Sequence, residues 1–345
     1  MASLIKRKQL PGRAAPAGDG GMYFTSEKTH HAFFSSGCTV LDCVLGGGWP
    51  LGRISNVVGD KSTGKTLVAI EAMTNFTRAF PNGQALYIEA ESAFDPEYAE
   101  ALGLPLKRVT IEDKIDTVEG FFDCTSQFLG INLTKEGEQK GELRTTPGLL
   151  VLDSLDALSD AAEMGREIDA GSYAMSKPKM LSQFFRRLVR PLGRTRTHVM
   201  IISQVRDAIG VTFGDKLTRS GGRALDFYAS QALWLRLLKT NNITREKVTR
   251  AVSLEIGAKC KKNKIATPLR ECSFNLRFGY GIEDIEANLH FLDQIGKAAL
   301  APKTEAFKKV RGAELTVMRK QLAAVVVREW YEFEKNFIAP EGKYA

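Results

Sequence analysis

The sequence carries, at residues 57–68, the stretch Val57-Val58-Gly59-Asp60-Lys61-Ser62-Thr63-Gly64-Lys65-Thr66-Leu67-Val68. It satisfies the P-loop pattern Gly-x-x-x-x-Gly-Lys-Thr, and it lies after a strand-like apolar run and before a helix-like one. The glycines let successive backbone N–H groups point inward at phosphate oxygens, and a helix that begins near Lys65 adds the positive end of its dipole. The stretch therefore predicts a strand, a phosphate-binding loop and a helix, the start of an α/β nucleotide-binding fold.

The polar groups of this loop have expected partners on the nucleotide. Lys65 is expected to reach the β- and γ-phosphates, and the hydroxyl of Thr66 is expected to bind Mg²⁺. A chance glycine-rich turn is the alternative, and the flanking strand and helix patterns argue against it. The predicted nucleotide-binding residues of the loop are Gly59, Asp60, Lys61, Ser62, Thr63, Gly64, Lys65 and Thr66.

Length and composition limit what the chain can be. Its 345 residues, 43% of them hydrophobic, can bury a sizeable core and suggest about two domains. The net charge of +8 suits a polyanionic partner, although charge alone is weak support. The five cysteines form no Cys-x-x-Cys pair, which argues against a zinc site or a disulfide framework. No apolar run approaches the roughly 20 residues of a membrane span, so we expect a soluble, cytoplasmic protein without a membrane partner.

Apolar runs of strand length alternate with helical patterns after residue 35, which is typical of a parallel sheet covered by helices. Strict apolar–polar alternation in two later segments predicts an antiparallel extension buried on one face. We expect a basic N-terminal arm or oligomerisation segment at 1–34, an α/β core at 35–297 with a surface insertion at 130–147, and a small C-terminal helical domain at 298–345. The predicted strands are 54–58, 85–88, 149–152, 199–202 and 233–238, followed by the alternating segments 252–256 and 272–278.

Polar side chains follow several predicted strands where those strands end, at the edge where open α/β sheets bind ligands. One strand ends in Asp153, the form of a Walker B segment, and this carboxylate is expected to hold Mg²⁺ through water. Another leads to Glu89 and Glu91, and spacing alone does not decide which of them could polarise an attacking water. A third leads to Gln204, an uncharged group that could sense a γ-phosphate.

Further motifs follow the P-loop, and together they carry a family resemblance. With them, from residue 36 to 296, the chain resembles the RecA-type recombinases, ATP-dependent strand-exchange proteins of bacteria and their phages. The P-loop alone would not separate this family from other ATPases, whereas the last three motifs together do. The resemblance implies a RecA-like P-loop ATPase core that binds ATP with Mg²⁺. The motifs are Glu89-Ala90-Glu91-Ser92-Ala93-Phe94-Asp95-Pro96-Glu97-Tyr98-Ala99, Leu152-Asp153-Ser154, Ser203-Gln204-Val205-Arg206, Ile209-Gly210-Val211-Thr212-Phe213-Gly214, Gly221-Gly222-Arg223-Ala224-Leu225-Asp226-Phe227-Tyr228-Ala229-Ser230 and Lys262-Asn263-Lys264-Ile265-Ala266-Thr267-Pro268.

The resemblance also implies roles for individual residues of the nucleotide site. It implies that Glu91 is the general base for hydrolysis and that Gln204 senses the γ-phosphate. Asp95 and Tyr98 fall where the family contacts and stacks on adenine.

Two lysines late in the core, Lys262 and Lys264, have a spacing that puts both ammonium groups on one side of an extended segment. Like charges placed in this way favour binding of an anion. The resemblance implies that they reach the γ-phosphate held by a neighbouring subunit and act in trans, as an arginine finger does. A solvated basic pair that adds to a DNA-binding surface is the alternative.

Two DNA-binding loops are implied by the resemblance, at residues 164–175 and 205–223. The second loop contains glycines that allow movement, basic side chains that suit phosphates, and Phe213 as an apolar wedge between bases. A solvated loop with scattered charge is the alternative. The predicted DNA-binding residues are Arg166, Lys179, Arg186, Arg206, Gly210, Val211, Phe213, Arg219, Gly221, Gly222 and Arg223.

Taken with the resemblance, these motifs predict a DNA-dependent ATPase that forms filaments on single-stranded DNA with ATP and exchanges strands with homologous double-stranded DNA. The expected partners are DNA and further copies of the chain in a helical homo-polymer, inside a bacterial or phage-infected cell. A hexameric helicase or branch-migration motor, and an ATP-switched DNA-binding scaffold with little hydrolysis, are the alternatives. The Pro- and Gly-rich start shows no sign of the family's N-terminal helix, which suits a phage or otherwise divergent member.

Overall fold

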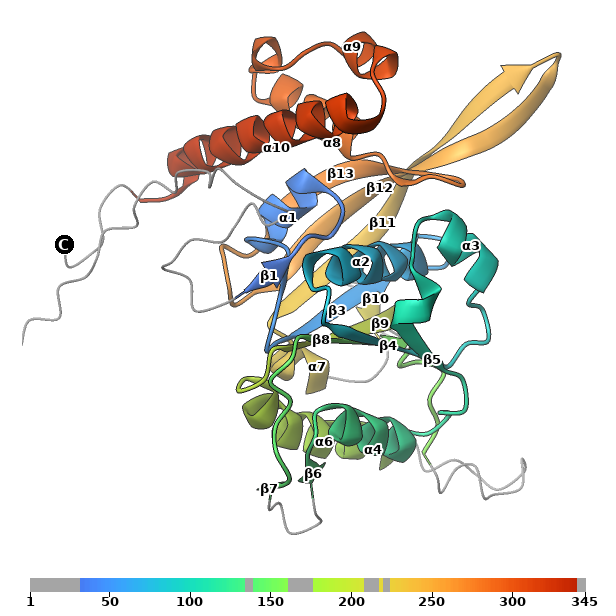
Figure 1. Ribbon diagram of the computed structural model, residues 1–345, viewed down its shortest axis with the longest axis vertical. Helices are drawn as coiled ribbons and strands as arrows, with labels where there is room; N and C mark the ends of the chain where they lie inside the picture. The colour runs from blue at the N-terminus through green and yellow to red at the C-terminus, as the bar shows by residue number, and fades with distance from the viewer. Residues whose placement is uncertain (1–31, 134–138, 161–175, 208–216, 220–223, 340–345) are drawn as a thin grey trace, which may run out of the picture.

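The computed structural model describes residues 32–133, 139–160, 176–207, 217–219 and 224–339. Among these residues ten strands form one large sheet, with helices on both faces (Figure 1). No helix in these ranges is long and apolar enough to cross a membrane. The strands of the sheet are β3 (Ile54–Gly59), β4 (Gln84–Glu89), β5 (Val109–Glu112), β8 (Gly148–Asp153), β9 (Thr197–Asp207), β10 (Leu217–Arg219), β11 (Gln231–Arg245), β12 (Val248–Asn263), β13 (Glu271–Arg277) and β14 (Gly281–Ile282).

The strands lie in the order β14, β13, β12, β11, β3, β9, β8, β4, β5, and β10 pairs with the far end of β9. The neighbours from β11 to β5 are parallel, whereas β11, β12, β13 and β14 pair antiparallel. This arrangement confirms the predicted parallel sheet with an antiparallel extension. Short pairs form outside the sheet, between β1 (Phe33–Phe34) and β2 (Trp49–Pro50) and between β6 (Asn132–Leu133) and β7 (Gln139–Lys140), the latter within the expected insertion.

Helices cover both faces of the parallel strands. The helix that follows the P-loop packs on one face, and two helices that precede and follow β8 pack on the other. Helices near both ends of the described chain cover one face of the antiparallel strands. The helices are α1 (Thr39–Leu45), α2 (Lys65–Ala79), α3 (Pro96–Ala101), α4 (Val118–Phe128), α6 (Ser176–Leu192), α7 (Ala224–Tyr228), α8 (Asp284–Gln294), α9 (Thr304–Lys309) and α10 (Gly312–Glu334), with 3₁₀ turns at Leu106–Arg108, Ala298–Leu300 and Lys335–Phe337.

Successive residues of the parallel strands enter two different cores. On β8, Leu149 and Val151 pack in the cluster that contains α2, whereas Leu150 and Leu152 pack in the cluster that contains α4 and α6. Strands buried on both faces read as continuous apolar runs in the sequence. For this reason the five predicted parallel strands were visible as runs, and all five are present in the structure.

Strands β11 and β12 form a hairpin that extends well beyond the sheet. Residues 231–235 of β11 pair with β3, and the two strands then continue together to a turn at Glu246 and Lys247, which both have positive φ. Most side chains of this outer part are exposed. The hairpin projects at the upper right of Figure 1. The run predicted at 233–238 is therefore only the first part of a longer strand.

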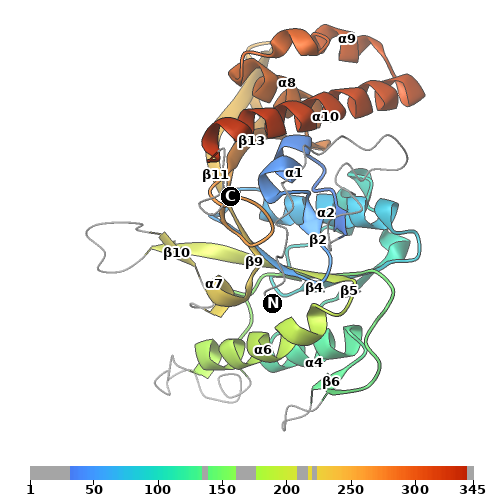
Figure 2. The same cartoon turned by 90° about the vertical axis from the view of Figure 1, so that its left-hand side faces the viewer.

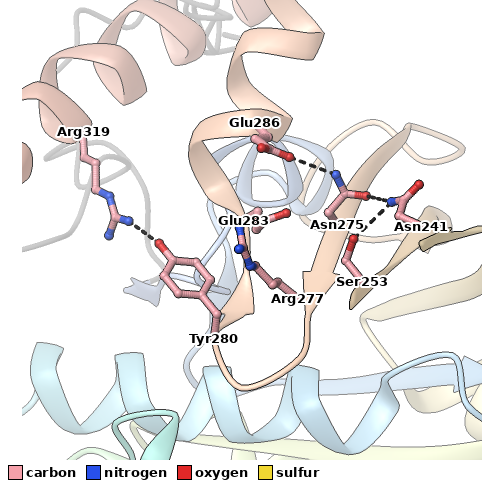
Figure 3. Close-up of polar contacts among 8 residues, drawn as sticks. All are labelled: Asn241, Ser253, Asn275, Arg277, Tyr280, Glu283, Glu286 and Arg319. Atoms are coloured by element: carbon pink, nitrogen blue, oxygen red, sulfur yellow. Dashed lines mark hydrogen bonds and ion pairs between the residues drawn. The ribbon is translucent and has the colours of Figure 1, made fainter. Parts of the chain in front are cut away.

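Polar side chains join the hairpin to the helices beside it (Figure 3). Asn241 on β11 donates to Oδ1 of Asn275 on β13 at 3.2 Å, and Asn275 donates to Oε2 of Glu286 on α8 at 3.1 Å. Arg319 on α10 donates to the hydroxyl of Tyr280, which lies between β13 and β14. These contacts connect the antiparallel strands to the C-terminal helices.

The C-terminal helices share the core of the sheet. Leu322, Val326 and Trp330 on α10 belong to the same buried cluster as residues of β3 and α2. In the described residues, the segment predicted as a separate domain at 298–345 is helical but has no core of its own. At the other end, Phe33 and Phe34 were placed in the N-terminal arm at 1–34 but are buried and form β1.

A buried histidine, His198 on β9, makes the stability of this fold sensitive to acid. Its Nδ1 contacts the carbonyl oxygen of Pro50 at 2.7 Å, and its ring packs edge-on against Phe34. Burial lowers the pKa of His198 from its ordinary value of 6.5 to about 4. The unfolded chain therefore binds a proton between these values that the folded chain does not, and the folded state loses stability as pH falls from 6.5 to 4.

We predict that His198 accounts for a loss of about 3 kcal/mol in the free energy of unfolding between pH 6.5 and 4. Urea unfolding of the wild type and of His198→Gln at both pH values measures the difference. Burial raises the pKa of Asp42 to about 7 and changes stability in the opposite direction, so the variant is needed to isolate the histidine. The exposed His290→Gln is the control. An equal pH dependence in wild type and His198→Gln would contradict the prediction.

Candidate nucleotide site

The P-loop connects the end of β3 to the start of α2, and at two of its glycines a Cβ would crowd a neighbouring side chain. Gly64 has a φ of +80°, and a Cβ at this position would lie 2.1 Å from Cδ1 of Leu276. A Cβ at Gly59 would lie 2.4 Å from the hydroxyl oxygen of Thr63. Because glycine has no side chain, the backbone at these two positions can curl tightly, as a phosphate-binding loop requires. The residues between them, Asp60, Lys61 and Ser62, are exposed, and Thr63 is buried.

The curled loop is held by its own polar groups. The hydroxyl of Thr63 and the ammonium group of Lys65 both donate to the carbonyl oxygen of Asp60 at 2.8 Å. Burial lowers the pKa of Lys65, and the nearby carboxylates of Asp153 and Glu91 act in the opposite direction. Lys65 thus lies across the loop beside two carboxylates, where a phosphate would be a ready partner for its charge.

The Walker B carboxylate of Asp153 contacts the P-loop helix directly. Its Oδ2 accepts hydrogen bonds from Thr66 at 2.7 Å and from the buried hydroxyl of Tyr87 at 2.8 Å. Burial raises the pKa of Asp153, and these two hydrogen bonds lower it.

Hydroxyl and carboxylate oxygens are hard donors that suit Mg²⁺, which commonly takes one or two protein ligands together with phosphates and water. Across the described ranges, no group of three or more His, Cys, Asp or Glu side chains could hold a metal ion by itself. Thr66 and Asp153 therefore fit a magnesium ion that is bound together with a nucleotide.

The two glutamates that spacing left undecided lie in different environments. Glu89 is buried, and its Oε1 accepts the backbone N–H groups of Glu91 at 2.9 Å and Ala93 at 3.2 Å. Glu91 is exposed at the site, and its Oε1 accepts hydrogen bonds from the hydroxyl of Ser154 and from Nε2 of Gln204, the latter at 2.8 Å. Glu89 thus holds the turn after β4, whereas Glu91 points toward the other polar groups at the strand ends.

Gln204 is held at both its backbone and its side chain. Its backbone N–H donates to Oδ2 of Asp156 at 2.7 Å, while its side chain donates to Glu91. Sequence analysis assigned no role to Ser154, Asp156 or Tyr87. The first two follow Asp153 closely, and the third is a hydroxyl inside an apolar run, but neither pattern identifies their partners across the sheet.

Comparison with known proteins agrees with this geometry. The family model described as the RecA N-terminal domain matches residues 18–283. The chain belongs to the RecA family. Protein RecA of Streptomyces venezuelae is 33% identical over 289 residues, which cover 82% of this chain and 71% of the relative. Protein RecA of Nostoc punctiforme is 34% identical over 263 residues, 76% of this chain and 67% of the relative. The family resemblance predicted from the motifs is therefore confirmed.

In this RecA-family chain, the residues predicted to contact adenine lie at the start of α3. Asp95 is the N-cap residue of that helix, and its Oδ1 accepts the backbone N–H of Tyr98 at 3.0 Å. Asp95 is exposed and Tyr98 is half-buried. Both side chains are thus accessible near the end of β4, and their contact with adenine stays a prediction.

Lys262 and Lys264 lie far from the P-loop of their own chain. Asn263, between them, pairs with Gln231, which in turn pairs with Ser55 at the start of β3, whereas the P-loop begins at the other end of that strand. The strand between Ser55 and Gly59 spans about 13 Å. Both ammonium groups instead contact the end of α7, where the carbonyl oxygen of Phe227 accepts from Lys262 at 3.1 Å and from Lys264 at 3.0 Å.

The predicted DNA-binding residues are only partly described by the structure. Lys179 and Arg186 are exposed on α6. Arg206 lies on β9 and Arg219 on β10, which pair antiparallel and project together from the side of the sheet (Figure 2). The remaining members of the predicted set lie outside the described residues: Arg166, Gly210, Val211, Phe213, Gly221, Gly222 and Arg223.

The different environments of the two glutamates lead to a matched pair of variants. Glu91→Gln should bind ATP but hydrolyse it about 10²-fold or more slowly, because the amide keeps the shape and loses the base. Glu89→Gln should stay near the wild-type rate, because its amide oxygen can still accept the N–H groups of Glu91 and Ala93. Single-turnover ATP hydrolysis with single-stranded DNA measures both. Near-normal turnover in Glu91→Gln would remove Glu91 from the role of base.

Proposed function

We propose that this RecA-family protein is a DNA-dependent ATPase that forms helical filaments on single-stranded DNA in its ATP-bound state. The filament pairs its strand with homologous duplex and exchanges strands, and ATP hydrolysis releases it. The observation that carries the proposal is the location of Lys262 and Lys264 at the end of the sheet opposite to the P-loop of their own subunit. A pair of cations so placed can meet a bound nucleotide only on another copy of the chain.

A nucleotide site shared between subunits would explain why DNA is needed for hydrolysis. Each subunit supplies a P-loop at one end of its sheet and a lysine pair at the other. Copies aligned along a strand of DNA would bring the lysines of one subunit to the γ-phosphate of the next, where they stabilise charge on the transferred phosphoryl group. ATP would then hold neighbouring subunits together, and its hydrolysis would loosen that contact.

Within one subunit, the proposed chemistry rests on groups at adjacent strand ends. Glu91 takes a proton from the attacking water, and its Oε1 already accepts a hydrogen bond from Gln204 at 2.8 Å. Nε2 of Gln204 carries two N–H groups, so one can donate to a γ-phosphate while the other is shared with Glu91, and Gln204 would link the phosphate to the base. Lys65 turns from the carbonyl of Asp60 to the β- and γ-phosphates.

Thr66 and Asp153 are the residues that would hold Mg²⁺. When the ion is bound, it would neutralise part of the charge on the phosphates. Tyr87 keeps the Asp153 carboxylate turned toward Thr66 through its hydrogen bond to the same oxygen.

The DNA contacts of the proposal follow from charge and position. Lys179 and Arg186 present exposed cations on α6, and the paired ends of β9 and β10 carry two further arginines in sequence. Cations of this kind bind the phosphates of a single strand and make the affinity fall as salt concentration rises. The net charge of +8 supports the same reading.

Electron microscopy with single-stranded DNA and a slowly hydrolysed ATP analogue tests the proposed assembly. We expect open helical filaments that require both the nucleotide and the DNA, and exchange that requires homology. Closed rings would favour a hexameric helicase or branch-migration motor. DNA binding without assembly and with negligible hydrolysis would favour a nucleotide-switched scaffold. In either case the proposed function would be wrong.

The shared site makes a separate prediction for the lysines. The double variant Lys262→Ala/Lys264→Ala should bind ATP as an isolated subunit but lose DNA-stimulated hydrolysis and ATP-dependent filaments. Mixing it with Glu91→Gln protein should restore part of the activity, because a mixed interface can join an intact Glu91 to intact lysines. Hydrolysis rates over a range of mixing ratios measure this recovery. A mixture that stays inactive while mixed filaments form would exclude the action in trans.

A further inference from the structure

Strand β9 loses its neighbour β8 just where it reaches the nucleotide site. The last paired residues are Leu152 on β8 and Ile201 on β9. One residue later the chain that leaves β8 still follows β9, because the N–H of Leu155 donates to the carbonyl oxygen of Ile202 at 3.0 Å. Beyond that point β8 has turned away, and the side of β9 that faced it would have no strand to pair with.

A carboxylate takes the next place in this ladder. In a strand, the carbonyl of one residue and the N–H of the residue two positions on face the same neighbour. Ile202 and Gln204 have this relation, and the N–H of Gln204 donates to Oδ2 of Asp156 at 2.7 Å. The Asp156 side chain thus extends the β8 side of the ladder by one hydrogen bond. A bond from an amide to a carboxylate is roughly twice as strong as one between neutral groups.

The backbone that Asp156 holds lies between two functional segments. On its other side Gln204 pairs with Gly59, the first residue of the P-loop, and its side chain donates to Glu91. Immediately beyond it, Val205 and the next two residues of β9 pair with β10, in the extension expected to contact DNA. Movement of the Gln204 backbone would therefore shift both the side chain that senses the γ-phosphate and the start of that extension.

We propose that Asp156 is a positioning residue that fixes the backbone of Gln204 and thereby couples the state of the nucleotide site to the DNA affinity of the β9–β10 extension. The proposal rests on the proposed function, because it assumes that this protein binds DNA differently with ATP and with ADP. Without Asp156, the side chain of Gln204 can still contact a γ-phosphate. However, β9 is then held on one side only at Gln204, so a displacement of the Gln204 backbone no longer reaches the β9–β10 extension.

The quantity that tests this role is the ratio of two dissociation constants for labelled single-stranded DNA, one with ADP and one with a slowly hydrolysed ATP analogue. Fluorescence anisotropy of the full-length protein measures both. Asp156→Ala should lower this ratio about tenfold, within the range usual for coupling between sites. Asp156→Asn should stay within about threefold of the wild type, because its amide oxygen can accept the same N–H. Asp123→Ala, which removes an exposed carboxylate from α4, should leave the ratio unchanged.

Two further measurements keep the outcome decisive. Affinity for a fluorescent ADP should be unchanged in Asp156→Ala, which shows that its P-loop is folded. If that variant does not fold, Asp156→Glu replaces it, since the longer side chain keeps the charge but displaces the acceptor, and it should also lower the ratio. A wild-type ratio in the Ala or Glu variant would overturn the positioning role. So would an equal loss in Asp156→Asn and Asp156→Ala, which would show that the charge acts and the hydrogen bond does not.

Failure of the proposed function gives a different result. If the wild-type protein binds single-stranded DNA equally with both nucleotides, the proposed function and the role of Asp156 are both overturned. If the wild type shows the ratio and Asp156→Ala keeps it, only the role of Asp156 is overturned.

Discussion

The register of four adjacent parallel strands holds the nucleotide site together. Gly59 at the end of β3 is level with Gln204 on β9, and Glu89 at the end of β4 is level with Asp153 at the end of β8. Because parallel strands end at the same edge, this register alone brings the P-loop, Asp153, the turn with Glu91 and Gln204 side by side. A shift of one residue in any of these strands would exchange its two faces and displace the site with them.

Burial on both faces is what keeps that register. The strands contribute alternate side chains to two apolar clusters, one with α2 and one with α4 and α6. No strand can slide or turn over without exposing one set of these side chains to water, which is costly for each buried aliphatic group. The polar site is thus positioned by apolar contacts behind it, and its own hydrogen bonds only adjust the final direction of each side chain.

Several polar groups of the site form hydrogen bonds with one another. Lys65 contacts the carbonyl of Asp60, Thr66 and Tyr87 contact Asp153, and Gln204 contacts Glu91. In each of these hydrogen bonds, a phosphate, a metal or a water could take the place of one partner. These groups can therefore meet a substrate by exchanging hydrogen-bond partners.

The sequence by itself determined the family, the P-loop, the mostly parallel sheet and the set of polar residues at the strand ends. These features depend on local patterns: the glycine spacing, the continuous apolar runs of doubly buried strands, and motifs in a recognisable order. The boundaries of the units were less visible, because the burial of Phe34 and of α10 in the common core depends on packing between distant segments.

Only the tertiary structure decided which groups meet. Tyr87 reaches Asp153, and Asp156 reaches Gln204, because β4, β8 and β9 are neighbours, an order that no periodicity along the chain encodes. The same holds for the environments of Glu89 and Glu91, because their different hydrogen-bond partners are not encoded in their spacing. The location of Lys262 at the far end of the sheet follows from its pairing through β11 to the start of β3. The sequence gives the chemistry of each side chain, but strand order and register set the distances between side chains.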